Sequence, residues 1–114
     1  MARDDLVYIG HMLELAHKAL ARVAGRDRAA FDADEDLRLV LTHLVQTIGE
    51  AARRVSPETQ AQHPEVPWKQ IVGMRHKIVH DYMTIDEDIL WQVVTRQLEP
   101  LAKSLTRIVP PDPT

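Results

Sequence analysis

Apolar residues recur at steps of three and four along two long stretches of the chain, and this spacing is typical of one face of an α-helix. In residues 4–24 the apolar positions are Leu6, Ile9, Leu13, Ala16, Leu20 and Val23. In residues 35–55 they are Leu37, Leu41, Leu44, Ile48, Ala51 and Val55. Two long helices of matching period are expected to pack antiparallel, with a close approach at Gly49, Ala51 and Ala52.

Start and stop signals mark the ends of these helices. Gly25 is expected to end the first helix in a left-handed conformation. The run from Phe31 to Asp34 predicts a turn and a capping aspartate before the second helix. Ser56 is expected to cap a further helix. That helix must be short, because two X-Pro pairs follow it, His63-Pro64 and Val66-Pro67.

Two more main helices are expected in the second half of the chain. Pro67 is placed to begin one of them. The run Thr84-Ile85-Asp86-Glu87 has the form of a capping box that opens the other, which Pro100 should kink or divide. No stretch alternates as a strand would. The sequence therefore predicts an all-α fold, an antiparallel bundle of four main helices plus a short one, with the last helix kinked at Pro100.

The length of 114 residues suits one domain. We expect a single helical domain over residues 1–109 and a flexible Pro-rich tail over residues 110–114. The chain has no cysteine, which excludes disulfides and thiolate metal sites. Its first residues are charged and precede no long apolar run, so neither a signal peptide nor a membrane span is expected, and a cytoplasmic protein is the default.

Charge is unevenly distributed along the sequence. The net charge is −3, which argues mildly against non-specific coating of nucleic acid. Acidic residues cluster in 27–36 and 86–88, and between them lie Lys69, Arg75 and Lys77 with two histidines beside them. A local cationic site on an acidic body suits contact with a few phosphates.

One nine-residue run, from Met74 to Tyr82, concentrates the reactive side chains. It contains Arg75, His76, His80 and Tyr82. At about 100° per residue, a continuous helix would place Arg75 and Tyr82 within roughly 20° of each other and Arg75 and His80 roughly 140° apart. Both Arg75 and His80 can then reach one target only if the helix end unwinds or if a second copy of the helix supplies one of them. We favour the second arrangement, a site across a two-fold interface.

Arginine and histidine together suffice for RNA cleavage without a metal ion. The guanidinium fork matches two phosphate oxygens, and an imidazole can move a proton near neutral pH. Two other interpretations stay open. These residues could be capping and surface groups, or His76 and His80, four apart, could share a helix face and bind a metal, although only Asp81 suggests a further ligand. Glu50 is either a solvated charge or the partner of a cation on a neighbouring helix.

Three segments together resemble the HepT-like branch of the HEPN superfamily in order and spacing. They are residues 46–52 (QTIGEAA), residues 66–75 (VPWKQIVGMR) and His80-Asp81-Tyr82, and the resemblance extends over roughly residues 6–108. The resemblance implies a dimeric helical bundle with ribonuclease toxin activity. Arg75 and His80 would be the catalytic pair, with His76 as the polar residue that accompanies the arginine. Tyr82 would be the tyrosine to which an antitoxin of the minimal nucleotidyltransferase class adds AMP.

Two functions of different classes follow from these observations. The first is a metal-independent, cofactor-free endoribonuclease that is the toxin of a toxin–antitoxin pair, acts on RNA as a homodimer and is neutralised by AMP addition at Tyr82. The second is a non-catalytic helical module that binds a nucleotidyltransferase and presents substrate to it. The acidic body of the protein favours the second function, whereas Arg75 and His80 favour the first.

Overall fold

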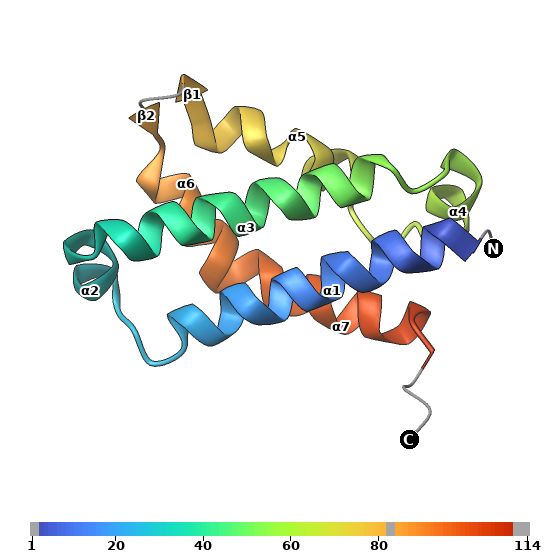
Figure 1. Cartoon of the computed structure of the whole chain (residues 1–114), viewed down its shortest axis with the longest axis horizontal. Coiled ribbons are helices and arrows are strands. Elements are labelled where there is room, and N and C mark those ends of the chain that lie inside the picture. Colours follow the sequence, from blue (N-terminus) through green and yellow to red (C-terminus); the bar gives the residue numbers. More distant parts are fainter. Residues whose placement is uncertain (1–2, 82–83, 111–114) are drawn as a thin grey trace.

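The computed structural model describes residues 3–81 and 84–110, and of His80 and Asp81 it describes the backbone only (Figure 1). The long helices are α1 (Arg3–Val23), α3 (Glu35–Arg53), α5 (Trp68–Ile78) and α7 (Leu98–Ile108). The short ones are α2 (Arg28–Ala33), α4 (Pro57–Gln62), α6 (Glu87–Gln92) and a π-helical segment, η1 (Val93–Gln97). Two short strands, β1 (Val79–Asp81) and β2 (Thr84–Ile85), lie between α5 and α6.

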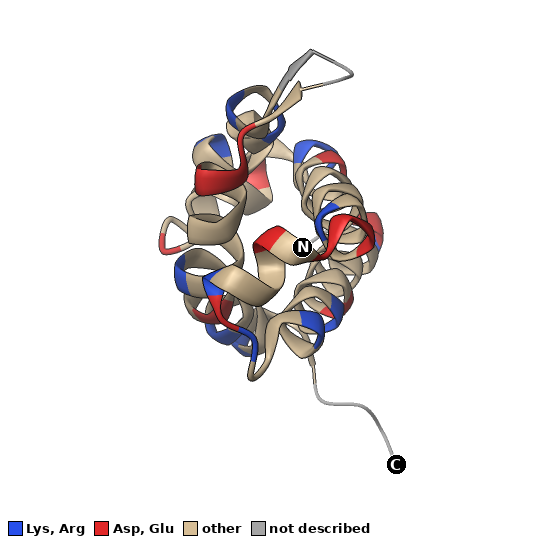
Figure 2. Cartoon of the chain, turned by 90° about the vertical axis from the view of Figure 1, so that its left-hand side faces the viewer, with Lys and Arg blue, Asp and Glu red and all other residues tan. Residues whose placement is uncertain are grey.

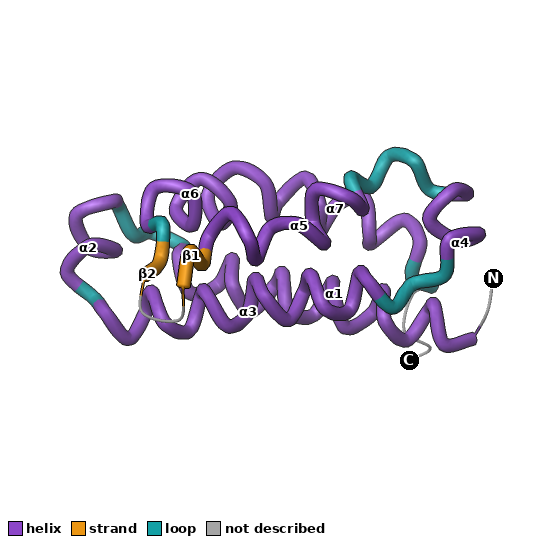
Figure 3. Tube along the Cα trace, turned by 90° about the horizontal axis from the view of Figure 1, so that it is seen from above, coloured by secondary structure: helices purple, strands orange, loops and turns teal. Residues whose placement is uncertain are grey.

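The helices form two layers, with α1 and α3 in one and α5, α6 and α7 in the other (Figure 3). Helix α3 packs against α1 and α5, and α7 packs against α1, which closes the bundle. The fully buried side chains at its centre include Ile9, Met12, Leu41, Ile48, Ile71 and Leu98. The predicted all-α helical bundle is confirmed.

The apolar stripes predicted the buried faces of α1 and α3. All six predicted positions from Leu37 to Val55 are buried. In α1, the positions Ile9, Ala16 and Val23 are buried, while Leu6, Leu13 and Leu20 are half-buried, and Met12 and Ala19 complete the core face. Gly25 follows α1 with φ +74°, so the predicted left-handed conformation is confirmed.

Gly49 makes a close helix contact, but with a different partner from the one expected. A Cβ added at Gly49 would lie 3.1 Å from the backbone oxygen of Ile71 in α5. The expectation that Gly49 serves the pairing of the first two helices was therefore wrong. Because this glycine has no side chain, α3 and α5 can approach each other closely at this point.

Helix α2 was expected only as a turn. Asp27 caps it, with its Oδ1 accepting from Ala30 N at 2.9 Å, and Asp34 caps α3 by accepting from Leu37 N at 3.0 Å. The capping aspartate is thus confirmed. The short helix exists because Phe31 is fully buried beside Trp91, with ring centroids 5.0 Å apart. That contact is remote in sequence, so no local pattern reveals it.

The strands β1 and β2 form an antiparallel hairpin that the sequence did not predict. They follow the end of α5 and project to one side of the bundle, as Figures 1 and 2 show. The predicted capping box at Thr84 was wrong, because Thr84 and Ile85 are extended and Asp86 is the cap of α6, accepting from Ile89 N at 3.0 Å. The backbone N–H of Asp86 also donates to Ile78 O at 2.6 Å, which joins the hairpin to the end of α5.

The last helical stretch is divided, as the proline predicted. The π-helical segment η1 lies directly before α7, and Leu98 N–H donates to Val93 O, five residues back. Pro100 is the third residue of α7 and has no N–H for the carbonyl of Arg96. The π-turn shifts the hydrogen-bonding pattern from i−4 to i−5 just before the proline, where an α-helical bond is missing. Residues 111–114 of the predicted tail lie outside the described residues, and no helix among the described residues is long and apolar enough to cross a membrane.

Candidate active site

The last turn of α5 presents three consecutive basic side chains to solvent. Arg75, His76 and Lys77 are exposed, while Met74 and Ile78 on the other face of the helix are buried. Cations are favourable at a helix C-terminus because the helix dipole is negative there. The end of the helix is thus anchored by two buried apolar residues, and its cationic side chains face solvent.

Helix α5 ends at Ile78, which changes the geometry expected for the motif. His80 lies on β1, beyond the helix, so the separation of about 140° between Arg75 and His80 does not apply. The helix end unwinds, which is the first of the two arrangements that the sequence left open. His76 and His80 do not share a helix face, contrary to the metal-pair interpretation. Tyr82 lies outside the described residues, and the helical argument that placed it above Arg75 fails for the same reason.

A cleft of about 560 Å³ lies along the line where α3 and α5 pack together. Helix α3 contributes His43, Gln46, Thr47, Gly49, Glu50 and Arg53, and α5 contributes Val72, Arg75 and His76. We call this the α3–α5 cleft. The close contact at Gly49 fixes the distance between α3 and α5 beside the cleft, because a Cβ at this position would lie 3.1 Å from Ile71 O. Of the predicted site residues, the structure brings Arg75 and His76 together in this cleft; the side chain of His80 is not described.

Glu50 supplies the negative charge of the α3–α5 cleft. Its Oε1 pairs with Arg53 Nη2 at 2.7 Å on the same helix. The hydrogen bond from Arg53 lowers the pKa of Glu50, and the positive charges of Arg53, Arg54 and Arg75 lower it further. Glu50 is therefore an exposed carboxylate paired within its own helix. Among the described side chains it makes no ion pair with a cation of a neighbouring helix, and Arg75 acts on it only through its charge.

Arg75 has no competing partner among the described residues. Neither Arg75 nor His76 makes a side-chain hydrogen bond or ion pair within residues 3–81 and 84–110, apart from any with the side chains of His80 and Asp81. By contrast, Arg53 and Arg28 are held by carboxylates at 2.7 Å. An arginine left unpaired in a cleft can offer its donors to an incoming anion such as a phosphate.

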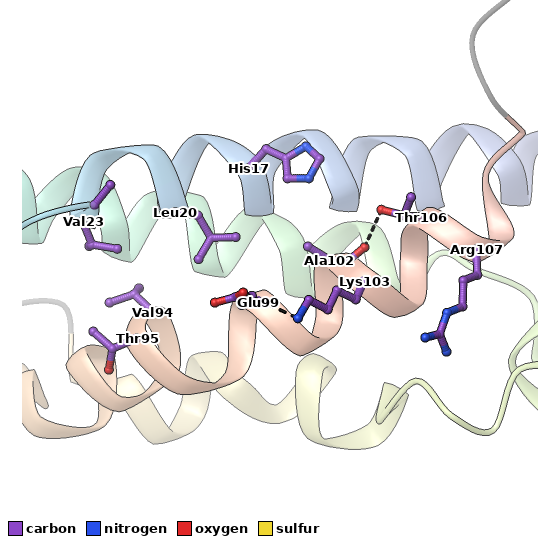
Figure 4. A pocket seen from close by; sticks show the side chains of 11 residues that line it. His17, Leu20, Val23, Val94, Thr95, Glu99, Ala102, Lys103, Thr106 and Arg107 are labelled. Atoms are coloured by element: carbon purple, nitrogen blue, oxygen red, sulfur yellow. Dashed lines mark hydrogen bonds and ion pairs between the residues drawn. The ribbon is translucent and has the colours of Figure 1, made fainter.

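A second groove, of about 750 Å³, lies between α1 and α7 (Figure 4). His17, Leu20 and Val23 line it from α1, opposite Val94, Glu99 and Ala102. Two charged side chains of this groove, Lys103 and Glu99, pair with each other at 3.6 Å. Arg75 and His76, the predicted site residues whose side chains the structure describes, do not line this groove. Over the part of the chain whose side chains are described, no three His, Asp or Glu residues are grouped to hold a metal ion.

Comparison with known proteins identifies the family. Residues 12–108 match the family model described as "Ribonuclease HepT-like". The chain belongs to the HepT-like ribonuclease family. The match includes all of α3 and α5 and therefore the whole α3–α5 cleft of this HepT-like chain.

Relatives of the HepT-like chain span nearly its full length. "Putative RNase TTE0752" of Caldanaerobacter subterraneus subsp. tengcongensis is 30% identical over 90% of this chain and 91% of its own length. "Putative RNase MJ1380" of Methanocaldococcus jannaschii is 28% identical over 90% and 94%, respectively. "Probable ribonuclease HepT" of Thermococcus cleftensis is 27% identical over 87% of each chain. No solved structure gives a significant match.

Of the polar side chains on the α3 wall of the cleft in this HepT-like chain, sequence reasoning singled out Glu50 only. His43, Gln46, Glu50 and Arg53 lie at steps of three, four and three, so they form one polar stripe of the helix. The signal was present, but a polar stripe on an amphipathic helix is by default a solvated face. The polar stripe of α3 lines a cleft because α5 packs beside it, and the sequence does not show that packing.

Proposed function

We propose that this HepT-like protein is a metal-independent endoribonuclease in which Arg75 and His80 act on one phosphodiester of RNA. The observation that carries the proposal is the unpaired guanidinium of Arg75 in the α3–α5 cleft, five residues before His80, in a chain of a ribonuclease family. The family relatives whose names describe ribonucleases favour the same reaction class.

The chemistry requires only groups of the chain and of the substrate. The imidazole of His80 takes the proton of a ribose 2′-hydroxyl, and the 2′-oxygen attacks the adjacent phosphorus. The bond from phosphorus to the 5′-oxygen breaks, and that oxygen takes up a proton. Arg75 stabilises the negative charge that grows on the non-bridging oxygens. The products are a 2′,3′-cyclic phosphate and a free 5′-hydroxyl, and DNA is inert because it lacks the attacking group.

Incubation of a defined RNA with the protein in EDTA tests this proposal. Wild-type protein is expected to cleave, while Arg75→Ala and His80→Ala should lose at least a hundredfold in rate, the lower range for a missing proton-transfer or charge-stabilising group. Lys77→Ala is the matched control, because Lys77 is an exposed cation in the same turn of α5 and has no role in the proposed step. Full activity in His80→Ala, or a requirement for a divalent ion, would rule the proposal out.

The same proposal includes two copies of the chain and an antitoxin. We infer that a homodimer completes the site, because the turn with Arg75, His76 and Lys77 is exposed and a second copy could place its own His80 beside Arg75. A minimal nucleotidyltransferase would then neutralise the protein by adding AMP to Tyr82. The added phosphate would bring negative charge to the segment between β1 and β2, close in sequence to the phosphate-binding arginine.

Mass measurement checks the AMP proposal. After incubation with the partner enzyme and ATP, the intact protein should gain the mass of AMP, and the modified peptide should contain Tyr82. Tyr82→Phe should show no gain while keeping its nuclease activity. Modification of a serine or threonine elsewhere would contradict the proposed switch.

A further inference from the structure

A second depression lies on the other side of α3 from the α3–α5 cleft. This groove, of about 530 Å³, lies between α1 and α3 and includes Tyr8, His11 and Arg54 among its lining residues. We call it the α1–α3 groove. Thr47 and Glu50 line both depressions, so they form the ridge between them. A ligand that leaves Arg75 in one direction therefore meets Glu50 and then the α1–α3 groove.

The charge along this path is positive after internal pairs are removed. Arg53 is matched by Glu50, and in the α1–α3 groove Lys18 is matched by Glu14 at 3.4 Å. Arg54 remains. Its side chain is exposed and makes no hydrogen bond or ion pair with the described side chains, although its charge acts on Glu50. The path thus has an unpaired guanidinium at each end, Arg75 in the cleft and Arg54 in the groove.

Aromatic rings accompany the second guanidinium. Tyr8 is half-buried and His11 is exposed, and both line the α1–α3 groove. An aromatic or imidazole face beside an arginine is the combination that binds unpaired nucleotides, since the ring stacks on a base and the guanidinium binds its phosphate. Helix α3 with its side chains is about 10–12 Å across, so one strand that reaches both grooves must span several nucleotides.

The position of Arg54 is fixed by the fold. Arg54 is the C-cap residue that follows α3, and its backbone N–H donates to Ala51 O and Ala52 O. Two residues later, Ser56 donates both its backbone N–H and its hydroxyl to the buried Asp5 of α1. The turn that carries Arg54 is therefore held between α1 and α3, which directs the side chain to the rim of the groove.

We propose that the α1–α3 groove is a second RNA-binding subsite, in which Arg54 binds a backbone phosphate of unpaired nucleotides flanking the bond cleaved near Arg75. The proposal rests on the proposed function in taking RNA as the ligand. It assigns to Arg54 a role in binding and none in the chemical step. The acidic Glu50 on the ridge keeps the path from becoming a general polyanion surface.

The salt dependence of binding tests the subsite. The probe is a fluorescent single-stranded RNA of about eight nucleotides with 2′-O-methyl groups throughout, which cannot be cleaved by 2′-hydroxyl attack. Loss of one phosphate contact to a single strand should reduce the slope of log Kobs against log [salt] by about 0.7. We expect this reduction in Arg54→Ala, with about threefold to tenfold weaker binding at moderate salt, whereas Arg54→Lys should keep the slope.

A control separates this subsite from general charge effects. Arg107 is also exposed and unpaired among the described residues but lies at the α1–α7 groove (Figure 4), so Arg107→Ala should keep the wild-type slope. The subsite proposal is overturned if Arg54→Ala keeps the wild-type slope while remaining folded by circular dichroism, or if Arg107→Ala lowers the slope equally.

Cleavage of a dinucleotide distinguishes the two proposals. A dinucleotide is too short to reach Arg54, so its kcat/KM should be the same in wild type and Arg54→Ala, while a longer RNA should be cleaved less efficiently by the variant. A protein that cleaves but shows no effect of Arg54 contradicts the subsite alone. A protein that binds the long probe through Arg54 but cleaves nothing contradicts the nuclease proposal alone.

Discussion

Asp5 illustrates how a single buried carboxylate can fix the scaffold on which the site depends. Only 3% of its surface is exposed. Its Oδ1 accepts from Ser56 N at 2.9 Å, and its Oδ2 accepts from the hydroxyls of Ser56 and Thr59 at 2.7 and 2.6 Å. These bonds tie the start of α1 to the start of α4. The hydrogen bonds from Ser56 and Thr59 lower the pKa of Asp5.

Replacing Asp5 by Asn should cost about 2 kcal/mol of the free energy of unfolding at pH 7, because one acceptor oxygen becomes a donor that faces other donors. Urea denaturation measures the change. Asp4→Asn is the matched control, since Asp4 is the exposed neighbour in the same turn, and it should change stability by less than about 0.5 kcal/mol. Equal effects of the two substitutions would contradict this role of Asp5.

The pH dependence of stability follows from the same group. Because the folded-state pKa of Asp5 is lower than that of the unfolded chain, Asp5 stabilises the protein fully above the unfolded pKa of about 3.9. That contribution falls as the pH drops through the folded pKa. The difference in unfolding free energy between wild type and Asp5→Asn should therefore shrink on going from pH 6 to pH 3.

Among the elements, α3 and α5 define the site, and Gly49 sets their spacing. A methyl group at Gly49 would meet the backbone oxygen of Ile71 at 3.1 Å, and that oxygen belongs to a helix that cannot yield without moving as a whole. A glycine-to-alanine change inside a helix otherwise gains up to about 1 kcal/mol. The steric cost and the propensity gain therefore oppose each other at this position.

We expect Gly49→Ala to be no more stable than wild type, because the steric cost cancels the gain in helix propensity. We also expect it to cleave RNA more slowly, because a displaced α5 carries Arg75 away from the α3 wall of the cleft. Gly73→Ala is the matched control: it lies in α5 beside the site, and an added Cβ there meets nothing within 4 Å. It should raise the melting temperature and keep the activity. Thermal denaturation and the cleavage assay measure both effects. A Gly49→Ala protein that is as stable and active as Gly73→Ala would contradict the account.

The elements that could be predicted from sequence are those with repeated local signals. The stripes of α1 and α3, the cap at Asp34 and the interruption near Pro100 each depend on residues close together in the chain. Helix α2 depends instead on the contact of Phe31 with Trp91, and the hairpin depends on pairing of Val79 with Ile85. Neither has a periodic pattern long enough to detect.

The site was predictable on one wall only. Arg75 and His76 were predicted as site residues and do share a cleft, since they are part of a distinctive cluster. The opposite wall, with His43 and Gln46, required knowledge of which face of α3 meets α5. His80 and Tyr82 were expected on a continuous helix. Helix α5 instead ends at Ile78, whose carbonyl accepts from the backbone N–H of Asp86, a residue distant in sequence.

At the scale of the whole molecule, the net charge of −3 does not describe the surface that meets the ligand. Many acidic side chains cap helices or pair with arginines and so stabilise the fold. Asp27, Asp34 and Asp86 cap helices, and Asp88 and Glu87 pair with Arg28 and Arg38 between α6 and the α2–α3 region. The unpaired cations Arg54 and Arg75 lie elsewhere, on the α1–α3–α5 side. An acidic protein can therefore present a local phosphate-binding surface.

The central claim is that Arg75 and His80 direct the 2′-hydroxyl of RNA onto the adjacent phosphorus, and the ends of the products test it most directly. Mass spectrometry of fragments from a defined RNA cleaved in EDTA should show 2′,3′-cyclic phosphate and 5′-hydroxyl ends, and one 2′-deoxy nucleotide at the cleavage position should abolish cleavage there. Fragments with 3′-hydroxyl and 5′-phosphate ends, or cleavage at the deoxy position, would contradict it.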